Sequence, residues 1–137
     1  MGMYTEVVFK ATISKKAIGA EAFYILDYMF NEHSQIELED LALPKHDFFE
    51  CGRWMHIGRS SSFYHHPKAV NSWCIPPYDF PIVYIFSRSD IKNYDNEIEK
   101  FFEWVTQYDI APEGDFIGYS LSEVGEKVTA YYMPVQA

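Results

Sequence analysis

The sequence predicts an α+β domain in which a mainly antiparallel sheet of about five to six strands carries two helices on one face. Several short segments alternate apolar and polar residues, as strands with one buried face do. Two longer segments place their apolar residues on one helical stripe. Because two amphipathic helices need a common apolar surface, we expect the order β-α-β-β-(β)-β-α-β-β within a single domain, residues 1–137.

The composition supports one independently folding domain. The chain has 137 residues, of which 48% are hydrophobic and 18% aromatic, enough for one core and unlike a disordered chain. No apolar run approaches the ~20 residues of a membrane-spanning helix, and Met1–Ile13 lacks the pattern of a secretory signal. Cys51 and Cys74 form no CxxC pair. We therefore expect a cytoplasmic protein with reduced thiols and no membrane contact.

The first third of the chain predicts a strand, a helix and a long connection. Residues Val7–Ile13 alternate in polarity, which indicates a strand. A helical stripe runs over Ile18–Met29, although Gly19 weakens its first turn and favours a later start. Residues Asn31–Glu50 are polar and are interrupted by Pro44. In one interpretation the apolar residues of this connection contact the core; in the other its middle contains a helical turn. Those apolar residues are Ile36, Leu38, Leu41 and Leu43.

The middle of the chain predicts strands. Residues Arg53–Ile57 and Ser62–His65 are interpreted as two short strands around a turn near Ser60, and Val70–Cys74 as a third. Residues Ile82–Phe86 are almost continuously apolar, which favours a central strand covered on both faces.

The last third predicts a helix and a hairpin. Asn93 or Asp95 can cap the helix, which we expect to end near Asp109. Its inward stripe contains Ile98, Phe101, Phe102, Val105 and Tyr108. Tyr24, Tyr28 and Trp104 fall beside the helical stripes, where they either extend the core or form an interface. The hairpin is expected to pair Phe116–Leu121 with Val128–Met133 through Gly125.

The charge pattern predicts a candidate anion-binding site. The net charge of -9 argues against direct nucleic-acid binding, yet all three arginines fall between Cys51 and Lys92. Guanidinium and hydroxyl groups together suit a phosphate or carboxylate, so the region is a candidate nucleotide or phosphopeptide site, or the site of a hydrolase. In the competing interpretation each arginine pairs with surface carboxylates. The candidate residues are Arg53, Arg59, Ser60, Ser62, His65 and Arg88.

The sequence gives only weak evidence for metal binding or for catalysis. If a two-residue turn lies at Ser60-Ser61, His56 would face His65 across a hairpin. Asp47 or His66 would then be the third ligand of a zinc site. No HExxH spacing and no GxSxG motif accompanies these residues. We therefore expect no metal, no cofactor and no catalytic residue.

Acidic residues of the second helix provide another candidate surface. Asp95, Glu97, Glu99 and Glu103 are expected to face solvent and to attract a basic protein partner. The alternative is a helix face that serves only solubility. With eleven tyrosines in the chain, these residues favour binding of a protein partner or assembly of a homodimer.

Several short strings resemble a family of small uncharacterised proteins encoded in bacteriophage and prophage genomes. They span most of the chain and comprise Met3-Tyr4-Thr5-Glu6, His46-Asp47-Phe48-Phe49 followed by Arg53-Trp54, Ser60-Ser61-Ser62-Phe63-Tyr64, Lys92-Asn93-Tyr94-Asp95-Asn96-Glu97-Ile98 before Phe102-Glu103-Trp104, and Phe116-Ile117-Gly118-Tyr119. The resemblance implies a phage origin and a place in the host cytoplasm. The leading hypothesis is a non-enzymatic phage accessory protein that binds a protein partner, and the alternative is the anion-binding domain or hydrolase.

Overall fold

The computed structural model describes residues 4–59, 69–76, 81–123, 125 and 128–135. Its elements are β1 (Thr5–Ser14), α1 (Lys15–Ile18), α2 (Ala20–Phe30), a 3-10 helix (Leu38–Asp40), α3 (Asp47–Glu50), α4 (His56–Arg59), β2 (Val70–Cys74), β3 (Ile82–Ile91), α5 (Glu97–Val105), β4 (Phe116–Ser122) and β5 (Val128–Tyr132). The predicted α+β class is confirmed. Within the described ranges, the helices are all too short or too polar to cross a bilayer.

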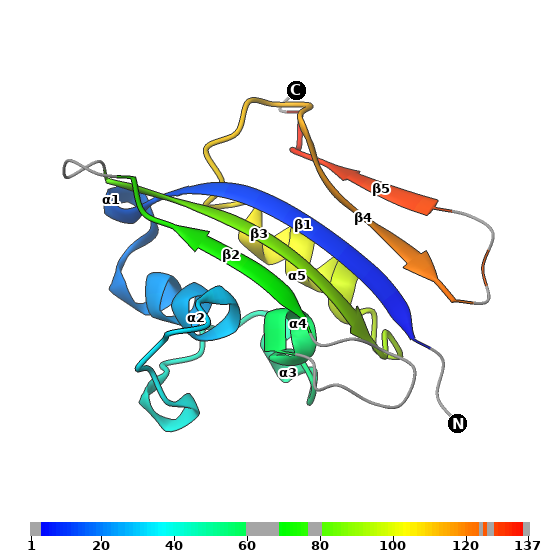
Figure 1. The fold of residues 1–137 in the computed structure, drawn as a ribbon, viewed down its shortest axis with the longest axis horizontal. Helices are drawn as coiled ribbons and strands as arrows, with labels where there is room; N and C mark the ends of the chain where they lie inside the picture. Colours follow the sequence, from blue (N-terminus) through cyan, green and yellow to red (C-terminus); the bar gives the residue numbers. More distant parts are fainter. Residues whose placement is uncertain (1–3, 60–68, 77–80, 124, 126–127, 136–137) are drawn as a thin grey trace.

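The strands form one antiparallel sheet in the order β2-β3-β1-β4-β5 (Figure 1). The N-terminal strand β1 is central, because it pairs with β3 along its whole length and with β4 over Thr5–Phe9. Strand β3 in turn pairs with β2, and β4 with β5. The predicted strands at Val7–Ile13 and Ile82–Phe86 are therefore neighbours, and each extends beyond its predicted limits.

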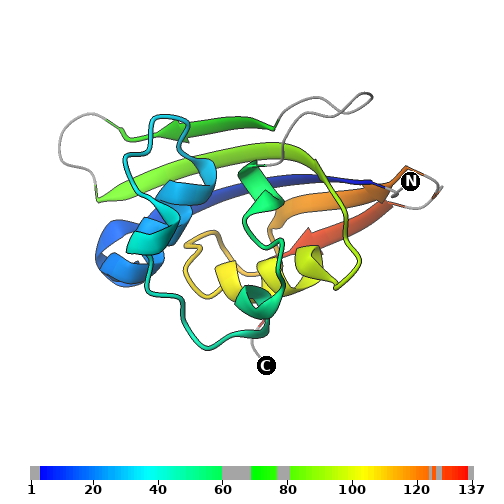
Figure 2. The same cartoon turned by 90° about the horizontal axis from the view of Figure 1, so that it is seen from below.

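Helices cover one face of the sheet, and the other face carries none among the residues that the structure describes. Val7, Phe9, Ala11 and Ile13 are buried at alternate positions of β1, as the polarity pattern predicted. The helices lie on that same side of the sheet, as the two views together show (Figures 1 and 2). The predicted packing of helices on one sheet face is confirmed.

Aromatic side chains fill the space between the helices and the sheet. The Phe101 ring of α5 lies edge-on to Phe9 of β1, with centroids 4.8 Å apart, and 5.4 Å from Phe48 of α3. Trp104 stacks near Phe48 and is 1% exposed. Tyr28 and Trp104 therefore belong to the core rather than to an interface, whereas Tyr24 is half-exposed.

The two amphipathic helices exist but are shorter than the stripes that predicted them. Helix α2 begins only at Ala20, because Gly19 has a φ of 81°, a conformation that favours glycine and does not continue a helix. Helix α5 begins after Asn96 and ends at Val105, not near Asp109. Asn93 does cap it, since its Oδ1 accepts a hydrogen bond of 2.9 Å from the Ile98 amide.

The predicted strand at Arg53–Ile57 is wrong. This segment forms turns that lead into α4, and Trp54 and Ile57 are both buried at helical spacing. Gly58 has a φ of 83° and lies so close to the Met29 carbonyl that a Cβ would overlap it. Tertiary contact with α2 therefore overrides the local strand pattern. The hairpin that would place His56 opposite His65 lacks its first strand, and Ser62–His65 lies outside the described residues.

The connection over residues 31–50 combines both of its predicted alternatives. It contains the 3-10 helix Leu38–Asp40 and, near its end, α3. Ile36 and Leu41 pack against the core, whereas Leu38 and Leu43 are exposed. The helical turn thus interrupts a segment that two apolar side chains hold against the domain.

Candidate functional site

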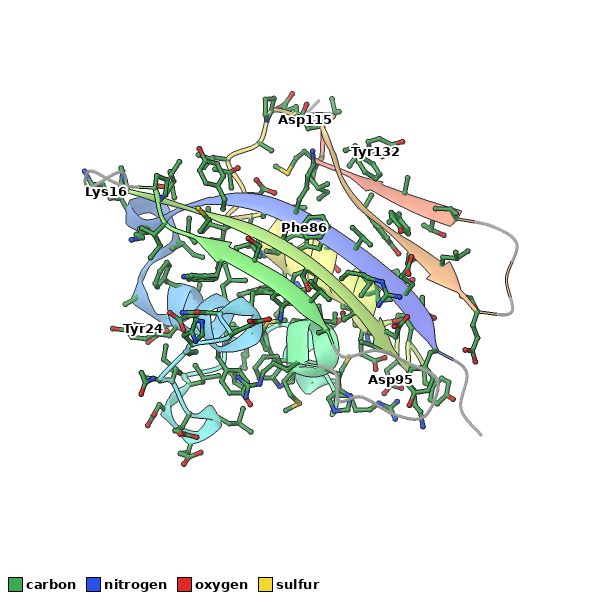
Figure 3. All side chains as sticks on the ribbon, in the orientation of Figure 1. Lys16, Tyr24, Phe86, Asp95, Asp115 and Tyr132 are labelled. Atoms are coloured by element: carbon green, nitrogen blue, oxygen red, sulfur yellow. The ribbon has the colours of Figure 1, made fainter. Side chains whose placement is uncertain are left out.

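The helix-free face of the sheet exposes an unusual set of large apolar side chains. Strand β3 was predicted to be covered on both faces, but Tyr84 and Phe86 point away from the helices and are each 46% exposed. Phe86 and Tyr132 are marked in Figure 3. Six residues that we call the outer apolar set, with exposures of 44–57%, are Val70, Tyr84, Phe86, Phe116, Val128 and Tyr132.

An ion-pair network lies on the same face and contains one of the predicted arginines. The Arg88 Nη2 atom lies 2.7 Å from Glu6 Oε2, and its Nη1 lies 2.9 Å from Asp90 Oδ2. The Tyr119 hydroxyl donates to Glu6 at 2.8 Å, and this bond raises the pKa of Tyr119. Two carboxylates therefore neutralise Arg88, as the competing interpretation of the arginines predicted.

The other two arginines lie on the helix side of the sheet. Arg53 Nε is 3.6 Å from Glu97 Oε2, and its guanidinium lies 5.2 Å from the centre of the Tyr94 ring. Arg59 donates to the Tyr28 carbonyl at 2.8 Å and lies 4.2 Å above the Tyr28 ring. The three arginines thus have three separate sets of partners. Ser60, Ser62 and His65 lie outside the described residues, so anion binding stays a prediction.

One member of the predicted acidic face is buried. Asp95, Glu99 and Glu103 are exposed, but Glu97 is 0% exposed and accepts a hydrogen bond of 2.6 Å from the Asp95 amide. Its carboxylate holds the start of α5 and faces Arg53, so the expectation that it faces solvent is wrong. Asp95, marked in Figure 3, is exposed, as are Glu103 and Glu99, the last of which accepts a hydrogen bond of 3.2 Å from Asn93.

Burial shifts the pKa values of a cysteine and a histidine on the helix side of the sheet. Cys51 is buried, and its burial raises the pKa of the thiol; the thiolate is the reactive form. Burial, together with the positive charge of Arg53, lowers the pKa of His56. In the part of the chain that the structure describes, no three His, Cys, Asp or Glu side chains are placed to hold a metal ion.

A cavity opens where β4 separates from β1. Their pairing stops at Phe9 and Gly118, and beyond this point the strands diverge (Figure 1). The segment after α5 returns to β1 there, since the Ile110 amide donates to the Thr12 carbonyl at 2.9 Å. The cavity has a volume of about 540 Å³ and is lined by both strands, by β3 and by residues 109–112.

A buried carboxylate forms part of the cavity wall. Asp109 is 7% exposed, and its Oδ1 accepts hydrogen bonds from the Ala111 amide at 2.9 Å and the Thr12 amide at 3.4 Å. Its Oδ2 is buried and has no hydrogen-bond partner among the described residues. Burial raises the pKa of Asp109 above its ordinary value, because an ionised carboxylate loses hydration there.

We expect this carboxylate to make stability depend on pH. A folded-state pKa above the unfolded one means that the folded protein binds the proton more tightly, so stability falls as pH rises from about 4 through the folded pKa. We expect Asp109→Asn, which keeps the Oδ1 acceptor, to gain thermal stability relative to the natural protein as pH rises across this window. Thermal melts from pH 4 to 8 measure the difference, and a gap that stays constant with pH contradicts this role.

Sequence reasoning missed both the cavity and the outer apolar set. Asp109 stands in the sequence Tyr108-Asp109-Ile110 before Pro112, which signals a loop but not contact with β1. The alternation of Tyr84 and Phe86 with buried Val83 and Ile85 was hidden because both sets are apolar. No family model, curated protein or solved structure matches this chain.

Proposed function

We propose that this chain is a non-enzymatic protein-binding module, that its binding surface is the helix-free face of the sheet, and that a second copy of the chain occupies that face. The observation that carries the proposal is the outer apolar set, which keeps 44–57% of each side chain in contact with solvent. Clustered exposure of this kind is typical of interaction surfaces in soluble proteins. Tyrosine and phenylalanine are also enriched at protein interfaces.

The balanced charge of the helix-free face favours contact between two copies through this face rather than through the rest of the surface. The chain has a net charge of -9, so two copies repel each other through most orientations. On the helix-free face the charged strand residues are Glu6, Lys10, Arg88 and Asp90, which balance. Because Arg88 is already paired with Glu6 and Asp90, burial of the network leaves each of these three charged groups with a partner.

The size of the face suits a dimer. Strands β1 and β3 each have ten residues, and strand rise and spacing give the five-stranded face dimensions of roughly 30 by 20 Å. The resulting area, on the order of 600 Å² per copy, falls at the lower end of standard protein interfaces. A face-to-face pair related by a twofold axis places the same apolar residues against each other.

The setting that we propose is a phage accessory protein, on the basis of the short strings that resemble the phage and prophage family. In a dimer built on the helix-free faces, the helix side of each copy stays accessible. The exposed carboxylates Asp95, Glu99 and Glu103 are then free to attract a basic protein partner.

Substitution of one apolar residue of this face by a charged residue tests the dimer. Phe86→Asp places a charge at the middle of the proposed interface, so we expect sedimentation velocity to show a loss of the dimer and at least a tenfold weaker self-association. Tyr24→Asp is the matched control, because Tyr24 is 50% exposed, against 46% for Phe86, but lies on α2. It is expected to leave the dimer intact.

Two results reject this interface. One is a natural protein that stays monomeric at the highest concentration reached in sedimentation. The other is a dimer that Phe86→Asp and Tyr24→Asp weaken equally, which would place the contact elsewhere.

A further inference from the structure

The cavity beside β1 has the lining of a small-molecule site. Its volume of about 540 Å³ falls within the range of ligand pockets, which are mostly apolar with a few polar groups that fix orientation. The aromatic side chains of Tyr84 and Phe116, both half-exposed, also line it. Its apolar wall is formed by Ala11, Ile82, Ile85, Ala111, Pro112 and Ile117.

Its polar groups favour a positively charged ligand. Asp109 contributes a carboxylate oxygen with no hydrogen-bond partner among the described residues, and such a group is costly to bury unless a donor reaches it. Asp115 adds a second carboxylate from the turn before β4. Among the described lining residues Lys10 is the one that is basic, and in the monomer its exposed side chain can extend its ammonium group into solvent.

We propose that this cavity binds the ammonium or guanidinium group of a small organic cation, with the carboxylates of Asp109 and Asp115 in its lining balancing the positive charge and the apolar wall holding its hydrocarbon or aromatic part. The rings of Tyr84 and Phe116 supply further attraction for a cation that lies against them. An anion of the same shape meets two carboxylates and is rejected. All of its lining comes from one chain, but Tyr84 and Phe116 also belong to the outer apolar set, so a dimer built on the helix-free faces covers this side of the cavity.

The charged and titratable groups that face Asp109 define the pH dependence of binding. Lys10 on β1 favours the ionised carboxylate, Asp115 opposes it, and burial opposes it most strongly. Tyr84 of β3 also lines the cavity. Because the carboxylate is the better acceptor for a cation, affinity rises with pH through the titration of Asp109 and is lost when that group is protonated.

Calorimetric titration of the full chain with 2-phenylethylamine tests the site, with the neutral isostere 2-phenylethanol and the anion 3-phenylpropanoate as comparisons. We expect the amine to bind at least tenfold more tightly than either comparison, since a hydrogen bond to a charged group is worth more than that factor. Nα-acetyl-lysinamide, which mimics a lysine side chain of a protein, is titrated in parallel. The comparison shows whether the cavity prefers the ammonium group of a small free amine or that of a protein side chain. Tighter binding of the lysinamide identifies the protein source.

Two variants assign the binding to the cavity. Asp109→Asn keeps the acceptor for the Thr12 and Ala111 amides and is expected to weaken amine binding at least tenfold, while Lys10→Gln is expected to strengthen it. In nuclear magnetic resonance spectra, the amides of Thr12 and Ala111 should shift with the amine. Absence of binding by both amines, or equal affinity in the Asp109→Asn variant, overturns the proposal. Because the dimer face shares Tyr84 and Phe116 with the cavity, the titration is also made with Phe86→Asp, which is expected to be monomeric, so that failure of amine binding and failure of the dimer are distinguished.

Discussion

Phe101→Ala is expected to reduce the free energy of unfolding by about 3–5 kcal/mol, as large-to-small changes of buried phenylalanine do. Phe101 is 0% exposed, and its ring meets Phe9 of β1 at 4.8 Å, Phe48 of α3 at 5.4 Å and Phe30 of α2 at 5.8 Å. It therefore joins the sheet to three helices. Alanine leaves a cavity at that junction and removes ring contacts that contribute beyond their buried area.

Urea unfolding measures this loss, with Phe86→Ala as the control. The two substitutions remove the same atoms, but Phe86 is 46% exposed on the helix-free face. We expect Phe86→Ala to cost less than about 1 kcal/mol in a monomeric sample, because surface changes have small effects. Equal losses for the two variants would be inconsistent with a core between the helices and one face of the sheet.

The elements that the sequence predicts correctly are those whose pattern is set by local burial on one face. Strand β1 alternates between buried Val7, Phe9, Ala11 and Ile13 and solvent-facing polar residues, so period two was visible without the rest of the chain. The same holds for the stripe of α5, where Ile98, Phe101 and Phe102 are buried. Both elements confirm the predicted architecture of helices on one sheet face.

The elements predicted incorrectly depend on contacts between distant segments. Glu97 has the residue type and the helix position of a solvated acid, yet it is fully buried because Arg53 and the Asp95 amide supply its partners. Arg53–Ile57 was predicted as a strand, but Gly58 lies against the Met29 carbonyl of α2, and the segment instead forms turns that lead into α4. A single-sequence pattern carries no information about either partner.

The candidate site was predictable only in part for the same reason. The sequence identified Arg88, but its partners Glu6 and Asp90 become visible only once β1 and β3 are paired in register. Asp109 was predicted near the end of a helix, because its contact with the Thr12 amide, 97 residues away in the chain, is not visible in the local sequence. Composition showed many aromatic residues but not which of them a sheet leaves exposed.

Gly118→Ala is expected to reduce the free energy of unfolding by about 3 kcal/mol, as overpacking of a tight contact does. Gly118 pairs with Phe9 where β4 meets β1, and a Cβ there would overlap the Val8 carbonyl oxygen and lie 3.0 Å from Phe102 Cζ. The carbonyl belongs to the central strand and cannot turn aside. Phe102 is also fixed, because its ring stacks on Tyr131 at 4.1 Å. The added methyl group therefore pushes β4 away from β1.

Gly52→Ala is the matched control for this substitution, because a Cβ at Gly52 meets nothing within 4 Å. We expect its unfolding free energy to stay within about 0.5 kcal/mol of the natural protein. Urea denaturation of both variants gives the comparison, and hydrogen exchange should show faster exchange of β4 and β5 amides in Gly118→Ala alone. If Gly118→Ala matches Gly52→Ala in stability, β4 does not approach β1 this closely. The cavity beyond Phe9 and Gly118, the last pair of β1 and β4, would then not be closed at this end by contact between the two strands.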